Sequence, residues 1–307
     1  MPAMLQNPFS NGNLMTKQSL PKARFMLVYS SRSLVKGICF LLLLIFLARP
    51  ALAADVIRIN GSGSGVEMMK PLTMAYSKAR PDVEFVMEKP LGSSGSIKAL
   101  LGGALDIAIS SRPLNPKEIT GGVILQKYGQ TPLTIVTNKD VGKRDITTQE
   151  LVAFYNDRTA NWPDGKKVRL VLRPLEDIDT KIIRKLSPEM DAAMTSAQER
   201  PGMTVAVTDP EASEDIAKTP GALGASGLTG VIIEHLPLNV MNLNGVEPTP
   251  ETLARGLYPL AKELDIVTLS TLSEPARKFL AFVYSLEGKS IAQSVGVRIT
   301  AGEKSPW

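Results

Sequence analysis

The 307-residue sequence has a single cysteine, Cys39, and a single histidine, His235. Cys39 lies one residue into an apolar run at residues 38–48, so the chain after this run has no cysteine. This absence excludes a disulfide framework, a thiolate metal site and a cysteine nucleophile in that part. With no cysteine or second histidine to share a metal ion, we expect no metal and treat His235 as structural.

Common catalytic motifs are also missing from residues 54–307. The sequence contains no G-x-S-x-G, no P-loop and no G-x-G-x-x-G in this range. The acidic residues Glu176, Asp177 and Asp179 do not have the spacing of a metal cage. We therefore expect neither enzymatic activity nor a cofactor, and a secreted phosphatase is only a distant alternative.

The net charge of +5 arises in the first 53 residues. These residues include six basic and no acidic side chains, so the remainder of the chain carries −1. Basic residues after this segment are dispersed and are not interleaved with aromatic ones, which argues against a nucleic-acid partner.

Residues 1–53 are typical of a secretory signal peptide. Basic residues precede the short apolar run, and Ala51-Leu52-Ala53 follows it as a cleavage motif, which predicts cleavage near Ala53 or Ala54. The run is shorter than the roughly 20 residues of a membrane span, and a retained membrane anchor is the alternative. The segment is long, and it leaves Met1, Met15 and Met26 open as the start. We expect export to the periplasm.

After residue 54 the pattern alternates between strands and helices. Short β-branched runs at residues 56–59, 83–88 and 106–109 are separated by helical patterns, each of which follows a glycine- and serine-rich turn. This order predicts an α/β fold with an open, mostly parallel sheet, in which ligands bind beyond the carboxyl ends of the strands. The pattern restarts near residue 132, which predicts two lobes joined by short crossovers.

Further elements are expected along the rest of the chain. We expect a strand at residues 131–140, a helix at 146–155 capped by Thr147 or Thr148, and a strand, turn and helix within 168–186. Helical spacing returns strongly at residues 274–296.

Three ordered segments resemble a known family. NGSGSGVEMMKPL, LGSSGSIKALLGGALDIAISSRPL and the tail NGVEPTPETLARGLYPLAKELDIVT occur in this order in phosphate-type periplasmic solute-binding proteins, the capture subunits of bacterial ABC importers. The resemblance covers nearly all of residues 55–300. It implies a type II periplasmic-binding-protein-like fold, in which the ligand cleft lies between two lobes. We assign residues 54–132 and 259–307 to lobe I and residues 133–258 to lobe II.

The resemblance also implies an oxyanion site built mainly from uncharged donors. Backbone N–H groups at helix starts, serine hydroxyls and one arginine suit a desolvated anion. The residues that match the family site are Ser62, Gly63, Ser64, Gly65, Val66, Ser93, Ser94, Gly95, Ser96, Ser110, Ser111, Arg112, Arg173 and Thr180. The implied partners are a small phosphate-like anion and the membrane subunits of an ABC permease, and the protein is expected to be a monomer.

Two departures from the family pattern bear on the ligand. Phosphate-binding members carry an aspartate where this chain has Ser111, and the third motif here reads RPLEDIDT, with three acidic residues added. These carboxylates either point outward, as acids at a helix N-terminus do, or the ligand is not simple phosphate. Arg173 could equally be a partner for these acids. A ligand-sensing or accessory protein that binds another polar ligand or a membrane partner is therefore the alternative function.

Overall fold

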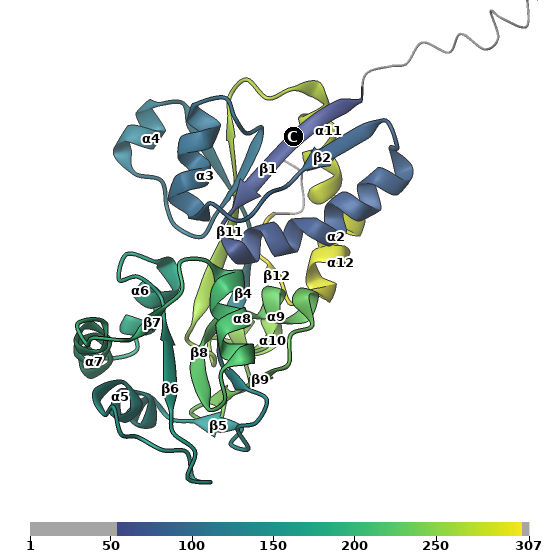
Figure 1. The fold of residues 1–307 in the computed structure, drawn as a ribbon. Helices are drawn as coiled ribbons and strands as arrows, with labels where there is room; N and C mark the ends of the chain where they lie inside the picture. The colour runs from purple at the N-terminus through teal and green to yellow at the C-terminus, as the bar shows by residue number, and fades with distance from the viewer. Residues whose placement is uncertain (1–53, 303–306) are drawn as a thin grey trace, which may run out of the picture. The chain divides into compact units, whose positions relative to one another are not determined.

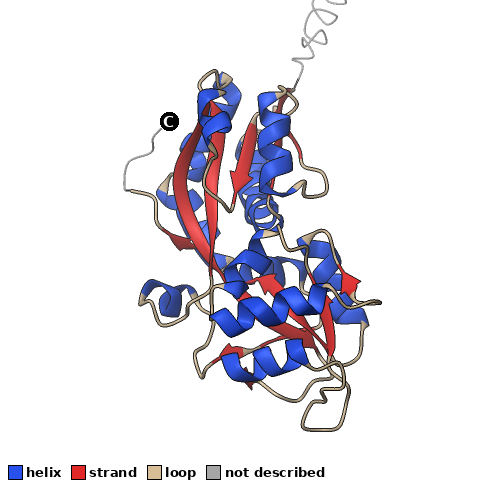
Figure 2. Ribbon diagram, turned by 90° about the vertical axis from the view of Figure 1, so that its left-hand side faces the viewer, coloured by secondary structure: helices blue, strands red, loops and turns tan. Residues whose placement is uncertain are grey.

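The computed structural model describes residues 54–302 and 307, so the predicted signal peptide lies outside the described residues. The fold is α/β, with helices flanking a mixed sheet, as Figure 2 shows. No helix in the described part of the chain is long and apolar enough to cross a membrane.

The first half of the expected order is confirmed. Strand β1 (Asp55–Gly61), helix α2 (Gly63–Ala79), β2 (Val83–Val86), α3 (Gly92–Leu101) and β3 (Ile107–Ser110) follow one another along the chain. Strand β1 pairs in parallel with both β2 and β3. The N-termini of α2 and α3 therefore lie at the carboxyl ends of these strands, where the sequence predicts a ligand.

A single long strand connects the two halves of the fold. The first part of β4 (Val123–Asn138) pairs with β11 (Ala261–Leu269) and β12 (Arg298–Ile299), and its last part pairs with β8 (Ala222–Gly227) and β9 (Leu238–Val240). All of these pairings are antiparallel, and the hydrogen-bonded path runs β2-β1-β3-β11-β4-β8-β6-β7. The connection is thus a continuous strand rather than the loop crossovers expected, and Figure 1 shows it between the two groups of strands.

The second half of the fold contains a parallel group. Strand β6 (Arg169–Leu172) pairs in parallel with β8 and with β7 (Thr204–Val205). The other strands are β5 (Asp145–Ile146) and β10 (Asn242–Leu243), which pair with each other. The other helices are α4 (Pro116–Thr120), α5 (Thr148–Asn156), α6 (Ile178–Arg184), α7 (Pro188–Gln198), α8 (Asp209–Lys218), α9 (Leu228–Glu234), α10 (Pro250–Ala254), α11 (Glu274–Val283) and α12 (Leu286–Ser294).

Capping residues fix the helix boundaries. The side chain of Thr147 accepts a hydrogen bond from the N–H of Glu150, which confirms the first of the two expected caps of α5. The helical pattern expected at residues 274–296 is two helices, because the side chain of Ser285 caps a new helix, α12.

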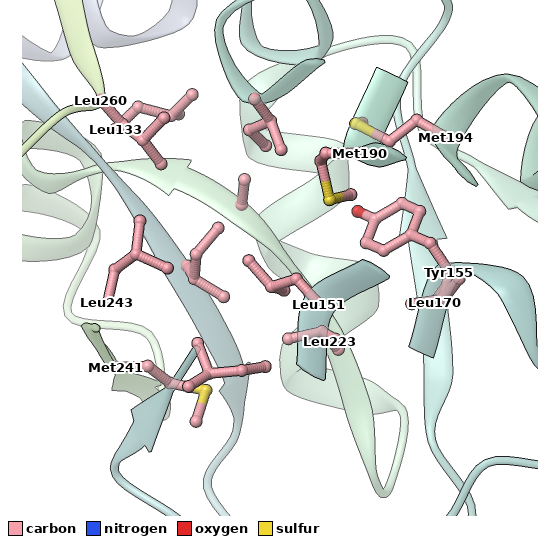
Figure 3. Close-up of a cluster of buried hydrophobic side chains, with 14 of the residues drawn as sticks. Leu133, Leu151, Tyr155, Leu170, Met190, Met194, Leu223, Met241, Leu243 and Leu260 are labelled. Atoms are coloured by element: carbon pink, nitrogen blue, oxygen red, sulfur yellow. The ribbon is translucent and has the colours of Figure 1, made fainter. Parts of the chain in front are cut away.

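The two halves have separate hydrophobic cores. One core packs α2 and α11 on β1 and β3 and includes an aromatic group of Tyr76, Phe85 and Phe279. The other lies around Leu133, Leu223 and the side chains shown in Figure 3. Burial of each set of apolar side chains stabilises the half in which it lies. The exact lobe boundaries, residues 54–132 with 259–307 and residues 133–258, remain a prediction.

Candidate functional site

A cavity of about 1080 Å³ opens at the carboxyl ends of the strands. Its lining combines the starts of α2, α3, α6 and α8 with one residue of β11. The predicted site residues that line it are Ser62, Gly63, Ser93, Ser94, Arg112 and Arg173. The other predicted residues, Ser64, Gly65, Val66, Gly95, Ser96, Ser110, Ser111 and Thr180, do not line this cavity.

The first serine-rich turn begins α2. The Ser62 side chain caps the helix by accepting from the N–H of Gly65 at 3.3 Å, and it also accepts from the hydroxyl of Ser111 at 2.8 Å. The N–H of Ser64 is not used for capping and points toward the second half of the protein, where it donates to a carboxylate of α8. The turn thus directs one helix N-terminal N–H toward an anionic group.

Asn60, which the sequence analysis did not identify, holds the two serine-rich turns together. Its buried Oδ1 accepts from the N–H of Gly61, the N–H of Leu91 and the hydroxyl of Ser96. Its amide also donates to the carbonyl of Lys89. Asn60 lies at the carboxyl end of β1, so its place in a strand–turn–helix pattern was a signal that it belongs to the site.

The second turn and the end of β3 interlock through their serines. Ser93 Oγ accepts from the N–H of Ser111 at 2.9 Å, and Ser110 Oγ donates to the carbonyl of Arg112 at 2.7 Å. These hydroxyls position the backbone, and a hydroxyl engaged in this way has less capacity for a ligand.

Arg112 is held by an acid. Its guanidinium donates to both carboxylate oxygens of Glu118, at 2.9 and 2.6 Å, and to Ser94 Oγ at 3.0 Å. The Arg112 hydrogen bond lowers the pKa of Glu118, although burial opposes it. Arg112 lines the cavity, but most of its guanidinium N–H groups already have hydrogen-bond partners.

Arg173, at the end of β6, is buried and faces the cavity. One terminal nitrogen donates to Asp177 at 2.6 Å and to Asp209 at 2.9 Å, while Nε is buried without a hydrogen-bond partner among the described residues. Thr180 is also buried, and its hydroxyl donates to the carbonyl of Arg173. Thr180 therefore positions Arg173.

The three acids of the third motif do not point the same way. Glu176 is exposed and pairs with Lys181 at the surface. Asp177 caps α6 and turns toward Arg173, and Asp179 is 1% exposed and lies 2.6 Å from Lys262. Glu176 and Asp177 thus both line the cavity, the first with its carboxylate in solvent and the second with its carboxylate on Arg173, whereas Asp179 is buried against Lys262 and does not line the cavity.

Two charged residues of the site were missed in the sequence. Lys262 on β11 is fully buried and pairs with Asp179 and with Asp209, the first residue of α8, each at 2.6 Å. A signal for Asp209 existed, because T-D-P-E at residues 208–211 is a capping box that begins a helix after a β-branched run. No local pattern marks Lys262 as a cleft residue.

The charges of this cluster hold one another in place. Burial alone would raise the pKa of Asp209, but Lys262 and Arg173 outweigh it and hold that pKa at about 2. Burial would likewise lower the pKa of Lys262 and of Arg173, yet the neighbouring carboxylates raise both. For Asp179, burial together with Asp209 and Asp177 raises the pKa against the opposing effect of Lys262.

The arrangement can bind an anion and offers no sign of a resident metal. Arg173, Lys262 and the N–H of Ser64 all donate to the carboxylate of Asp209, which lines the cavity, and donors arranged in this way suit a desolvated oxyanion. Among residues 54–302 and 307, no group of three or more histidine, cysteine or acidic side chains is arranged to hold a metal ion.

Comparisons with known sequences agree with this geometry. A family profile described as a PBP superfamily domain matches residues 48–287. A phosphate-binding protein PstS from Borreliella burgdorferi is 26% identical over 250 residues, which cover 78% of this chain and 88% of the relative. A phosphate-binding protein PstS from Bacillus subtilis is 25% identical over 244 residues, covering 76% and 78% of the two chains.

Solved structures share the fold. A structure from Clostridium perfringens with bound phosphate has a TM-score of 0.64 at 20% identity and covers 79% of this chain and 98% of its own. An ABC-type phosphate transport receptor from Vibrio cholerae has a TM-score of 0.54 at 21% identity, with coverage of 79% and 99%. At these identities the likeness establishes the two-lobed α/β fold.

Proposed function

The chain belongs to the PBP superfamily, and from this premise we propose that it captures an inorganic oxyanion, phosphate foremost, for an ABC importer. The relatives named phosphate-binding protein PstS, which match over most of their length, support this assignment. In this role the protein acts in the periplasm as a monomeric carrier and passes its ligand to the permease subunits.

One observation carries the proposal. The N–H of Ser64, the guanidinium of Arg173 and the ammonium of Lys262 all donate to one carboxylate, that of Asp209. Donors from α2, from the residue that follows β6 and from β11 therefore already converge on a pair of anionic oxygens. A tetrahedral oxyanion presents oxygens of the same kind and can use the same donors.

The mechanism follows from where these donors lie. The α2 and α3 N-termini, held together by Asn60, form one wall of the cavity, and Arg173 with the start of α6 forms the opposite wall. An anion binds first on one wall, and bending of β4, whose two parts pair with strands of different halves, brings the other wall onto it. Closure excludes water and strengthens each charge-assisted hydrogen bond.

A second candidate rests on the acids in and beside the cavity. Asp177, Asp179 and Asp209 together outnumber Arg173 and Lys262, so the cluster carries a formal charge of −1. A ligand that also brings a positive charge, or a membrane receptor that needs no anion, is compatible with such a balance. This ligand-sensing or accessory role predicts weak or absent oxyanion binding.

Calorimetric titration of the purified protein with phosphate, sulfate, molybdate and pyrophosphate at two pH values separates the two candidates. The carrier role predicts one-to-one binding of phosphate with a Kd below about 1 µM. Arg173→Ala should weaken this binding at least about tenfold, because a buried charge-assisted donor is lost.

The matched control is Arg169→Ala. Arg169 lies on the same strand, β6, but is exposed and donates to the carbonyl of Pro220 away from the cavity. It should leave the phosphate affinity unchanged. No heat of binding with any of the four anions would reject the oxyanion carrier and favour the accessory role.

A further inference from the structure

The carboxylate of Asp209 occupies the point on which the cavity's donors converge. Its Oδ2 accepts from Lys262 Nζ at 2.6 Å, from the Ser64 N–H at 3.2 Å and from the Ser64 hydroxyl at 3.4 Å, and its Oδ1 accepts from Arg173 at 2.9 Å. We propose that Asp209 is a built-in occupant of the anion seat, which an incoming oxyanion must displace, and that Asp209 thereby sets ligand affinity and selectivity. This proposal rests on the proposed function of the same site.

The start of α8 presents Asp209 to the cavity without needing it as a cap. The side chain of Thr208 accepts from the N–H of Glu211 and caps the helix, and Glu211 in turn accepts from the N–H groups of Val207 and Thr208. Asp209 occupies the first helical position, and its side chain is left to point into the cavity. Its negative charge is also favoured by the N-terminus of its own helix.

The opposite turn is shaped to receive this carboxylate. A Cβ atom at Gly63 would lie 2.4 Å from Asp209 Cβ and 2.5 Å from Oδ2, distances that no real side chain tolerates. Glycine is therefore required at the point where the α2 turn meets α8. A close approach of this kind, together with four polar contacts, distinguishes a seated group from an acid that happens to be near two cations.

The charge count shows why the seat holds one anion at a time. Without Asp209, the cations Arg173 and Lys262 balance Asp177 and Asp179, and the seat is neutral with a helix N-terminal donor facing it. With Asp209 in place, its carboxylate already accepts from Arg173, Lys262 and the Ser64 N–H, so a second anion would find these donors taken and would be repelled by the carboxylate in a buried site. The bound oxyanion and the seated carboxylate are thus alternatives.

Competition of this kind lowers the apparent affinity by the fraction of molecules in which the seat is free. A ligand with more acceptor oxygens than a carboxylate, such as phosphate, uses donors that Asp209 leaves unpaired, among them Nε of Arg173. An anion with no more acceptor oxygens than a carboxylate gains no such advantage. Asp209 therefore makes the site selective at some cost in affinity.

The test compares Asp209→Asn, which keeps the shape and removes the charge, with Glu214→Gln. Glu214 lies on the same helix, is exposed and pairs only with Lys218 at the surface, so its substitution removes the same charge away from the cavity. Phosphate affinity of each is measured by calorimetry. We expect Asp209→Asn to bind phosphate at least about tenfold more tightly than wild type and Glu214→Gln to match wild type. Equal or weaker binding by Asp209→Asn would overturn the proposal and make Asp209 an acceptor for the ligand.

A second readout does not depend on the identity of the natural ligand. In Asp209→Ala the seat lacks its carboxylate, so free formate should raise the thermal unfolding midpoint of this variant relative to sodium chloride of equal ionic strength, and should not do so for wild type. If no form of the protein binds phosphate, the proposed function fails, and the formate measurement alone then tests whether Asp209 occupies the seat. A formate-specific rise keeps Asp209 as an occupant of the seat, whereas no rise rejects that role.

Discussion

Lys262 Nζ lies 2.6 Å from Oδ1 of Asp179, and the side chains of both residues are at most 2% exposed. The contact joins β11 to α6, two elements that lie far apart in the chain. A buried pair of this kind contributes little net stability when intact, because both ions have lost their water, but removing one partner leaves an uncompensated charge.

Lys262→Met should therefore destabilise the protein strongly. The substitution leaves Asp179 and Asp209 buried beside each other with Arg173 as their remaining cation, and we expect a loss of about 3 kcal/mol in the free energy of unfolding. Denaturant unfolding measures the loss. Lys218→Met, which breaks an exposed pair with Glu214, is the control and should change stability by less than about 0.5 kcal/mol. A small loss for Lys262→Met would show that water reaches the cluster.

Glu234 should make stability fall as the pH rises toward neutrality. Burial first, and then repulsion by Glu67, raise the pKa of Glu234 to about 7 in the folded protein, well above its value in the unfolded chain. Between about pH 4.5 and 7 the folded state binds the extra proton, so stability is greatest below this window and is lost as the pH rises through it.

Glu234→Gln should remove this pH-dependent loss. We expect a gain of about 1 kcal/mol at pH 8 and almost none at pH 4, because Glu234 is only partly buried and water screens part of the effect. Unfolding curves at both pH values test the prediction. An equal gain at pH 4 and pH 8 would mean that the substitution acts through packing rather than through the charge.

Asn60→Ala should affect both stability and binding. It leaves the N–H groups of Gly61 and Leu91 without their acceptor in a buried turn, which costs about 2 kcal/mol, and it loosens the α2 and α3 N-termini that face the cavity. Asn239→Ala is the matched control, since Asn239 donates to the carbonyls of Asn138, the last residue of β4, and of Val141, and none of these residues lines the cavity. Asn239→Ala should destabilise the fold yet keep phosphate affinity, and equal affinities in the two variants would contradict the role of Asn60 in the site.

Gly63→Ala tests the close approach of the α2 turn to Asp209. The added Cβ would lie 2.4 Å from Cβ of Asp209, and we expect a loss of about 2 kcal/mol in wild type and clearly less in an Asp209→Gly background, which removes that atom. Gly142→Ala, at a position with no atom within 4 Å of the added Cβ, serves as control. Purely additive effects of Gly63→Ala and Asp209→Gly would show that the two residues do not touch.

Much of the fold can be predicted because its signals are local. Serine and glycine in the turns before α2 and α3 predict the starts of these helices, and β-branched runs predict β1, β2 and β3. The antiparallel insertion of β11 between β3 and β4 could not be predicted. It depends on pairing between segments far apart in the chain, and no periodicity within either strand encodes its partner.

The site residues likewise divide into those that local motifs predict and those that only the tertiary structure reveals. The serine turns and Arg173 are visible as motifs, but the contact between Ser64 and Asp209 spans 145 residues of sequence. The inward aim of Asp179 likewise depends on Lys262, whose burial only the three-dimensional pairing of β11 reveals. Local chemistry predicts which residues can bind an anion, whereas the carboxylate already bound there comes from tertiary structure.

The central claim, that the donors around Asp209 form an oxyanion site, is tested most directly by a crystal structure of the protein grown with phosphate. We predict a phosphate whose oxygens accept from Ser64 N–H, Arg173 and Lys262, with the Asp209 carboxylate moved off these donors. A cavity in which phosphate is absent, or bound elsewhere while Asp209 keeps its contacts with Arg173 and Lys262, would contradict the claim.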